Sequence, residues 1–107
     1  MNEHHQDMID LANDVDDIAE RQDLDQPIRG QFRKANSDAM GAIFDSHDHH
    51  ENGNTQAAHA GLLVAARHVI NSAKLVEGAA GYRIPELAGI KNNAEIYANQ
   101  YKNAFRS

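Results

Sequence analysis

The sequence contains no cysteine. That absence excludes disulfide bonds, thiolate metal sites and thiol-based catalysis. It fits a reducing compartment, and we expect a cytoplasmic protein. The opening residues, Met1 to His5, are polar and acidic, unlike the basic and apolar start of a signal peptide. No run of apolar residues approaches the ~20 needed to cross a bilayer, so we expect no membrane association.

Large apolar side chains are scarce. Six Leu, eight Ile, four Val and three Phe make up 21 of the 107 residues, near the lower limit for a folded chain. Seventeen alanines compensate in part, because alanine favours helices and lets them pack closely. The length predicts a single domain over residues 1–107. Its core is thin, so we expect either modest stability or a homodimer that completes the core.

Basic residues are also few, with 10 Lys and Arg against 16 Asp and Glu and a net charge of −6. A general nucleic-acid binder needs a basic surface, so we do not expect direct nucleic-acid binding. The charge favours a protein partner with a basic surface. Many proteins, however, carry such a charge for solubility alone.

A catalytic constellation is missing as well. Ser46, His47 and Asp48 are consecutive, and the members of a catalytic triad must instead converge in space with a defined orientation. There is no G-x-S-x-G nucleophile elbow. The segment 78–81 has two glycines but lacks the lysine of a phosphate-binding loop. We therefore expect a non-enzymatic protein with no cofactor, apart from the metal considered below.

Glycine and proline interrupt the sequence at three places, residues 23–27, 47–54 and 78–85. Between them, apolar residues recur at steps of three and four, which is typical of amphipathic helices, and no segment alternates as a strand would. Asn54 or Thr55 can cap the third helix and Gly78 can end it. We predict an all-α fold, an up-down antiparallel bundle of four helices over residues 3–22, 26–46, 55–77 and 85–105.

This topology brings six of the seven histidines to one end of the bundle. They begin the first helix, close the second helix or lie in its loop, and occupy the first turns of the third: His4, His5, His47, His49, His50 and His59. Neutral imidazole is a good transition-metal ligand, which predicts a Zn or Ni site made by His47, His49, His50 and His59.

Two other interpretations of these histidines stay open. Crowded imidazoles resist protonation, so acidification could push this end of the bundle apart as a pH switch. The spacing matches no known zinc pattern, which favours a solvated polar loop without any ligand.

A row of carboxylates follows the first helix. Asp7, Asp10, Asp14 and Asp17 step by three, four and three, and so form a second stripe beside the apolar one. Such a row could clamp a basic partner. The alternative is a solvated face whose charges pair with neighbours, and the basic residues that could do so are Arg29, Arg33 and Lys34.

The last connection contains Tyr82 and Arg83 between glycines and a proline. An aromatic residue beside an arginine has the composition of an interface anchor. The alternative is that Tyr82 fills the end of the bundle.

Three hypotheses for function follow. The first is a non-enzymatic acidic helical interaction protein, an adaptor or inhibitor of the kind that phages and mobile elements encode. It would dock a basic surface of a macromolecular partner through Asp7, Asp10, Asp14, Asp17, Tyr82 and Arg83. The second is a helical bundle that binds a transition metal at its histidine-rich end. The third is a self-assembling structural protein.

Overall fold

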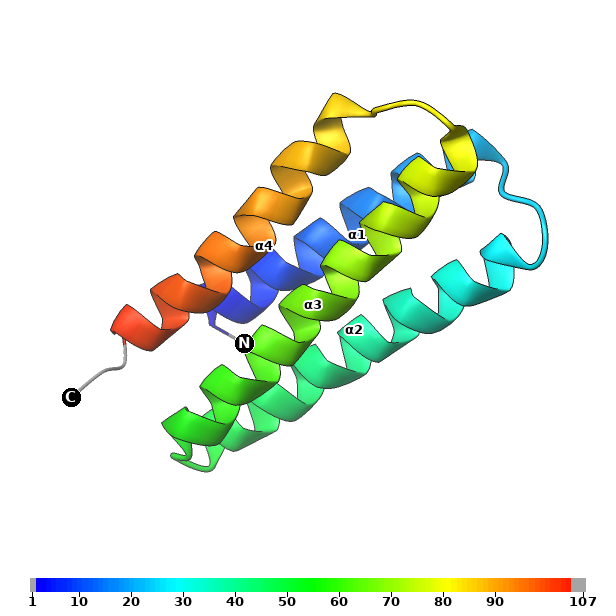
Figure 1. Cartoon of the computed structure of the whole chain (residues 1–107). Helices are drawn as coiled ribbons and strands as arrows, with labels where there is room; N and C mark the ends of the chain where they lie inside the picture. Colours follow the sequence, from blue (N-terminus) through cyan, green and yellow to red (C-terminus); the bar gives the residue numbers. More distant parts are fainter. Residues whose placement is uncertain (1, 105–107) are drawn as a thin grey trace.

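Four α-helices form an up-down antiparallel bundle in this computed structural model, which describes residues 2–104 (Figure 1). They are α1 (Glu3–Gln22), α2 (Ile28–Glu51), α3 (Thr55–Ala80) and α4 (Pro85–Ala104). Over residues 2–104 there is no strand. The predicted all-α bundle is therefore confirmed. The molecule is elongated, with extents of 44 × 23 × 16 Å.

Asparagine side chains begin two of the helices. The Asn2 side-chain oxygen accepts the backbone N–H of His5 at 3.1 Å at the start of α1. The Asn54 side chain accepts the backbone N–H of Ala57 at 3.2 Å at the start of α3. Each bond satisfies one of the N–H groups that a helix leaves unpaired in its first turn. The predicted cap of the third helix is thus Asn54.

The second helix is longer than predicted, because α2 continues past residue 46 to Glu51. His47, His49 and His50 therefore lie on the last turns of a helix and not in a loop. The buried stripe of α2 continues through Ser46, which keeps these turns against the bundle. The reversal into α3 takes place at residues 52–54, where Gly53 adopts a φ of +78°. Glycine reaches this left-handed conformation at little cost.

The third helix also passes its predicted end, so the prediction that Gly78 ends it was wrong. Gly78 is helical, and α3 ends at Gly81, which has a φ of +74°. The Gly81 N–H donates to the Glu77 carbonyl at 3.1 Å. Ala79 and Ala80 favour the helix and carry it to the next glycine that can adopt the left-handed conformation.

The core runs the length of the bundle, and alanine is its commonest residue. Small residues allow α2 and α3 to approach closely. A Cβ added at Gly61 of α3 would lie 2.9 Å from the Cβ of Ser46 on α2. At this crossing the Ser46 hydroxyl donates to the Ala58 carbonyl of α3 at 2.5 Å. A buried serine thus has a backbone acceptor on the neighbouring helix, as a buried hydroxyl requires.

No helix over residues 2–104 is both long and apolar enough to cross a membrane.

Candidate functional site

Five histidines and one tyrosine gather where α1 and α3 begin and α2 and α4 end. The ring of His5 lies 5.8 Å, centroid to centroid, from the rings of both His47 and His50. The ring of Tyr101 on α4 lies 5.6 Å from His5. His4 and His59 pack against Tyr101, with centroids at 5.7 and 6.3 Å. We call this cluster the histidine pole: His4, His5, His47, His50, His59 and Tyr101.

Two histidines lie outside the pole. His49 is on the same turn of α2 as His50, but it is exposed to solvent. Adjacent residues on a helix point about 100° apart, so only one of the two can face the bundle. His68 lies in the middle of α3.

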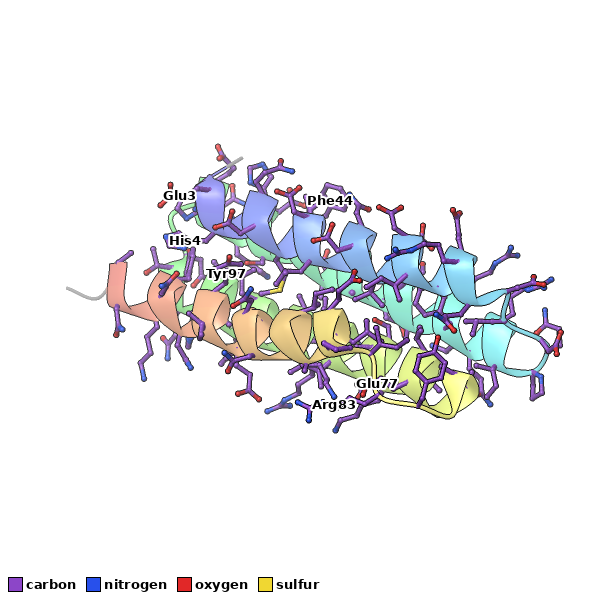
Figure 2. All side chains as sticks on the ribbon, turned by 90° about the horizontal axis from the view of Figure 1, so that it is seen from above. Glu3, His4, Phe44, Glu77, Arg83 and Tyr97 are labelled. Atoms are coloured by element: carbon purple, nitrogen blue, oxygen red, sulfur yellow. The ribbon has the colours of Figure 1, made fainter. Side chains whose placement is uncertain are left out.

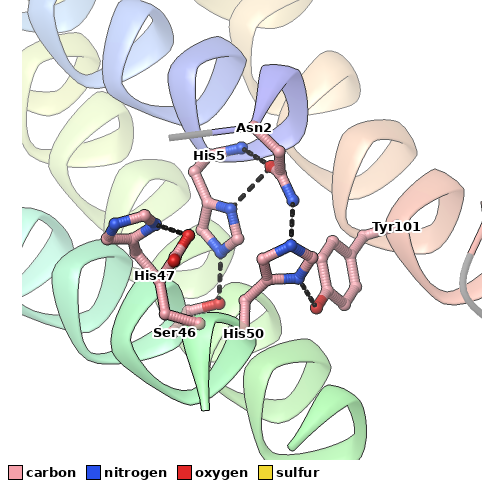
Figure 3. Close-up of polar contacts among 7 residues, drawn as sticks. Asn2, His5, Ser46, His47, His50 and Tyr101 are labelled. Carbon is pink, nitrogen blue, oxygen red and sulfur yellow. Dashed lines mark hydrogen bonds and ion pairs between the residues drawn. The ribbon is translucent and has the colours of Figure 1, made fainter. Parts of the chain in front are cut away.

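His5 is the centre of the pole and is fully buried. Its Nδ1 lies 2.6 Å from the side-chain oxygen of Asn2 (Figure 3). Its Nε2 lies 2.8 Å from the Ser46 hydroxyl, which in turn donates to the Ala58 carbonyl. One imidazole therefore connects the start of α1 to α2 and, through Ser46, to α3.

His50 makes the corresponding connection to α4. Its Nδ1 lies 3.0 Å from the Tyr101 hydroxyl, and its Nε2 lies 3.4 Å from the amide nitrogen of Asn2. An amide nitrogen can only donate, so Nε2 of His50 is the acceptor and Nδ1 carries the proton. The start of α1 and the end of α4 thus meet through the side chains of Asn2 and His50.

Two acceptors face the ring of His5, but the neutral ring has only one N–H to donate. The Asn2 side-chain oxygen is an acceptor only, and the proton of Ser46 is directed to Ala58. Both ring nitrogens of His5 therefore face acceptors. Only the doubly protonated imidazolium could donate to both, because the neutral ring has one N–H.

Burial and neighbouring charge act in the opposite direction. Burial first, and then the nearby His50, His47 and His4, lower the pKa of His5 to about 4. A buried cation is costly, and like charges around it add to the cost. At neutral pH His5 is therefore uncharged, and one of its two side-chain contacts lacks a bridging proton.

The predicted metal site does not form in this arrangement. Over residues 2–104, no group of three or more His, Asp or Glu side chains is placed to hold a metal ion. His49 faces solvent, His50 uses both ring nitrogens within the protein, and His47 Nδ1 lies 3.9 Å from Glu51 Oε1. The set His47, His49, His50 and His59 is therefore not a Zn or Ni site in this geometry.

Ser46, His5 and Asn2 are connected in the order of a nucleophile, a base and an orienting group. The arrangement differs from a catalytic site in two respects. Ser46 is fully buried, and its proton goes to the Ala58 carbonyl and not to the histidine. A nucleophile needs access to substrate and a base that takes its proton. These three residues form a structural connection between helices.

The acidic row lies on the outer side of α1. Asp10, Asp14 and Asp17 are exposed and Asp7 is half-buried, while the opposite side of α1 buries its apolar stripe. Over residues 2–104, no ion pair involves any of these four carboxylates, and Gln6 donates to Asp10 at 3.0 Å.

The basic residues that could have neutralised the row are placed elsewhere. Arg29 donates to the Leu24 carbonyl at 2.8 Å and lies 3.9 Å from Asp23, and Lys34 pairs with Asp38 at 3.0 Å. Arg33 lines a shallow pocket between α1 and α2 that the row does not reach. The alternative in which α2 supplies the counter-charge is therefore not what the structure shows.

The other carboxylates of the row affect the pKa of Asp14. Partial burial first, and then Asp17 and Asp10, raise the pKa of the Asp14 carboxyl. Neighbouring carboxylates disfavour each other's ionised form, so a cation placed against the row would relieve this repulsion.

Tyr82 and Arg83 lie in the connection between α3 and α4, at the end of the bundle opposite the histidine pole. Tyr82 is 60% exposed, and its hydroxyl donates to the side chain of Gln22 at the end of α1 at 3.3 Å. It does not plug the bundle. Arg83 lies near Glu77 (Figure 2), and it lines a surface pocket together with Tyr82 and with Ile18, Arg21 and Gln22 of α1. Tyr82 and Arg83 are therefore both next to the C-terminal end of the helix that carries the acidic row.

Among residues 2–104, the other exposed large apolar side chains are Phe44, Val64 and Ile96, one on each of α2, α3 and α4. Apolar side chains exposed singly are normal on the surface of a monomer. The homodimer therefore stays a prediction.

A scan against protein-family models and searches of curated proteins and of solved structures find no match to this chain.

Sequence reasoning missed Asn2, Ser46 and Tyr101 as partners of the histidines and placed His4 on the apolar stripe of α1. The structure buries His5 completely and His4 only partly. A signal was present, because His5 lies three residues before Met8 and His4 lies four before it, and both steps suit a buried stripe. Asn2, three residues before His5, also has the position and type of an N-cap.

Proposed function

We propose that this protein is a non-enzymatic interaction protein that docks a basic surface of a macromolecular partner through the acidic row of α1. The supporting observation is that four carboxylates follow one another along a helix with no cation paired to any of them over residues 2–104. An adaptor or an inhibitor would use such a surface in the same way.

The basic residues of the chain strengthen this proposal. Four cations are engaged with other acids, in the pairs Arg21–Glu86, Arg29–Asp23, Lys34–Asp38 and Lys91–Glu77. None of these four cations therefore neutralises the row. Like charges at these helical spacings cost a few tenths of a kcal/mol per pair. A basic partner would remove that cost and gain attraction at the same time.

An aromatic side chain lies beside the C-terminal end of the helix that carries the row. Asp17 lies near the end of α1, and Tyr82 contacts Gln22 in the last turn of the same helix. A mostly exposed tyrosine is a common anchor in protein interfaces, because its ring is apolar and its hydroxyl is polar. We propose that Tyr82 supplies the apolar part of the docking surface. Arg83 lines the same pocket as Tyr82 and Gln22, and it would contact the partner beside that ring.

The test is capture of a partner from the native host's lysate, followed by affinity measurement with the purified partner. Charge reversal of Asp10→Lys with Asp14→Lys should weaken binding at least tenfold, because close charge pairs at interfaces contribute about 1.5 kcal/mol or more each. The matched control is Asp25→Lys with Asp45→Lys, which changes the net charge equally at exposed positions outside α1.

Tyr82→Ala should also weaken binding without changing the helical content. Binding to the row should weaken steeply as salt rises, since exposed charges are screened. If the row variant and the control variant bind the partner equally well, the acidic row is not the docking surface.

A further inference from the structure

Polar contacts to buried partners hold the first turns of α1 on the bundle. Asn2 contacts His50, and His5 contacts Ser46 across the interface with α2. The next buried side chain of α1 is Met8, almost one helical turn further along. The seating of this end of α1 therefore depends on the protonation state of a buried imidazole.

The groups that face His5 are other imidazoles, a phenol and a backbone carbonyl. His4 approaches it from α1, and His47 and His50 approach it from α2. From α4 it meets Tyr101, a neutral phenol whose pKa is raised by burial. From α3 the nearest polar group is the Ala58 carbonyl, reached through Ser46.

Other titratable groups lie further out in the pole. His59 stacks on Tyr101, and burial and then Lys102 lower its pKa. Glu51 is exposed and lies 3.9 Å from His47. No ion pair involving His5 is found over residues 2–104. Over the described residues, a proton added to His5 would thus meet three other imidazoles and no carboxylate in contact.

We infer that the histidine pole is a pH-sensitive contact that seats the start of α1 while His5 is neutral and releases it on acidification. The release is local. Gly61 and Ser46 pack α2 and α3 closely together, and the apolar stripe of α1 beyond Met8 does not titrate. Release would expose Met8 and Tyr101, which are fully buried in the closed form. Acid would therefore give the protein an apolar surface at this end.

The size of the effect follows from proton linkage. His5 has a pKa of about 4 when it is buried and an ordinary value of 6.5 when it is released. The released form therefore gains about thirtyfold in population on going from pH 7.5 to pH 5, because it binds the proton that the closed form resists.

Amide hydrogen exchange by NMR on the full chain tests this inference, with rates corrected for the intrinsic effect of pH. The amides of Met8 and Ile9 should lose protection by about thirtyfold between pH 7.5 and pH 5. The amide of Val69 in α3 should keep its protection. The loss of protection should begin near pH 6.5 and level off near pH 4, where the ring signals of His5 in the closed form should titrate.

Two variants distinguish the effect of His5 on the pH dependence from the effect of the other histidines. His5→Leu removes the titrating group, so the protection of Met8 relative to Val69 should no longer change with pH. His49→Gln removes an exposed histidine from the same end, and its pH dependence should match that of the wild type. If His5→Leu does not fold, the wild type decides the matter: the pH at which the loss of protection levels off should equal the pH at which the ring of His5 titrates.

Three results would overturn the inference. The first is that α1 and α3 lose protection together, which would indicate global unfolding. The second is unchanged protection of Met8 down to pH 4.5. The third is a His5→Leu variant whose pH dependence equals that of the wild type. None of these measurements involves a partner, so the inference stands or falls apart from the proposed docking function.

Discussion

Gly61→Ala should destabilise the bundle although alanine is the better helix former. Gly61 lies within α3, where alanine alone would stabilise a helix by about 1 kcal/mol. The new Cβ would, however, lie 2.9 Å from Ser46 Cβ and 3.2 Å from Ser46 Cα. The second of these atoms is backbone, so the clash can be relieved only by moving α2 away from α3.

Two opposing contributions determine how much Gly61→Ala changes the free energy of unfolding. Overpacking a closely packed interface costs about 1–3 kcal/mol, and helix propensity returns about 1 kcal/mol. The separation of α2 and α3 would also lengthen the bond from Ser46 to Ala58 and move Ser46 relative to His5. We therefore expect a net loss of about 1–2 kcal/mol together with a disturbed histidine pole.

The matched control is Gly41→Ala in α2. A Cβ at Gly41 would meet no atom within 4 Å, so this variant reports helix propensity alone. Urea denaturation followed by circular dichroism gives the free energy of unfolding of both variants. NMR of the His5 ring then shows whether the pole has moved.

Gly41→Ala should be slightly more stable than the wild type and Gly61→Ala clearly less stable, with a gap of about 2–3 kcal/mol between them. If the two alanine variants have the same stability, α2 and α3 do not approach as closely at Ser46 as described. If Gly61→Ala is destabilised but the His5 signals are unchanged, the pole does not depend on this crossing.

Three further predictions concern the titratable groups. Because the pKa of His5 is lowered from 6.5 to about 4, its contribution to stability is full above pH 6.5 and is lost as the pH falls toward 4, by up to about 3 kcal/mol. His5→Leu should therefore flatten the pH dependence of urea denaturation, and equal slopes for variant and wild type would contradict this. Tyr101→Phe removes a buried hydroxyl bonded to His50 and should cost about 1 kcal/mol at pH 7 by the same assay, whereas an unchanged stability would show that the bond contributes nothing. The pKa of Asp14 is raised, so its ionised form is unfavourable in the folded state, and Asp14→Asn should stabilise the protein by a few tenths of a kcal/mol at pH 7 but not at pH 3. Thermal unfolding of Asp14→Asn at both pH values checks this, and a loss of stability at pH 7 would be the opposite of what the row's repulsion requires.

The periodic apolar residues and the caps of the helices were sufficient to predict the bundle. Steps of three and four between apolar residues define helices whatever surrounds them, and short connections force neighbours to run antiparallel. That topology alone predicted that histidines from α1, α2 and α3 share one end of the molecule. The errors in helix length were local, because Gly53 and Gly81 end the helices and the intervening residues tolerate helix well.

Only the packing of the helices decided which of these histidines are buried and which residues they contact. Whether His4 or His5 turns inward depends on the rotation of α1 against α2, and a rotation is set by many side-chain contacts at once. The partners of His5 come from residues 2 and 46, and its low pKa comes from burial among other imidazoles. Burial and through-space charge are properties of the folded chain, so no spacing along the sequence contains them.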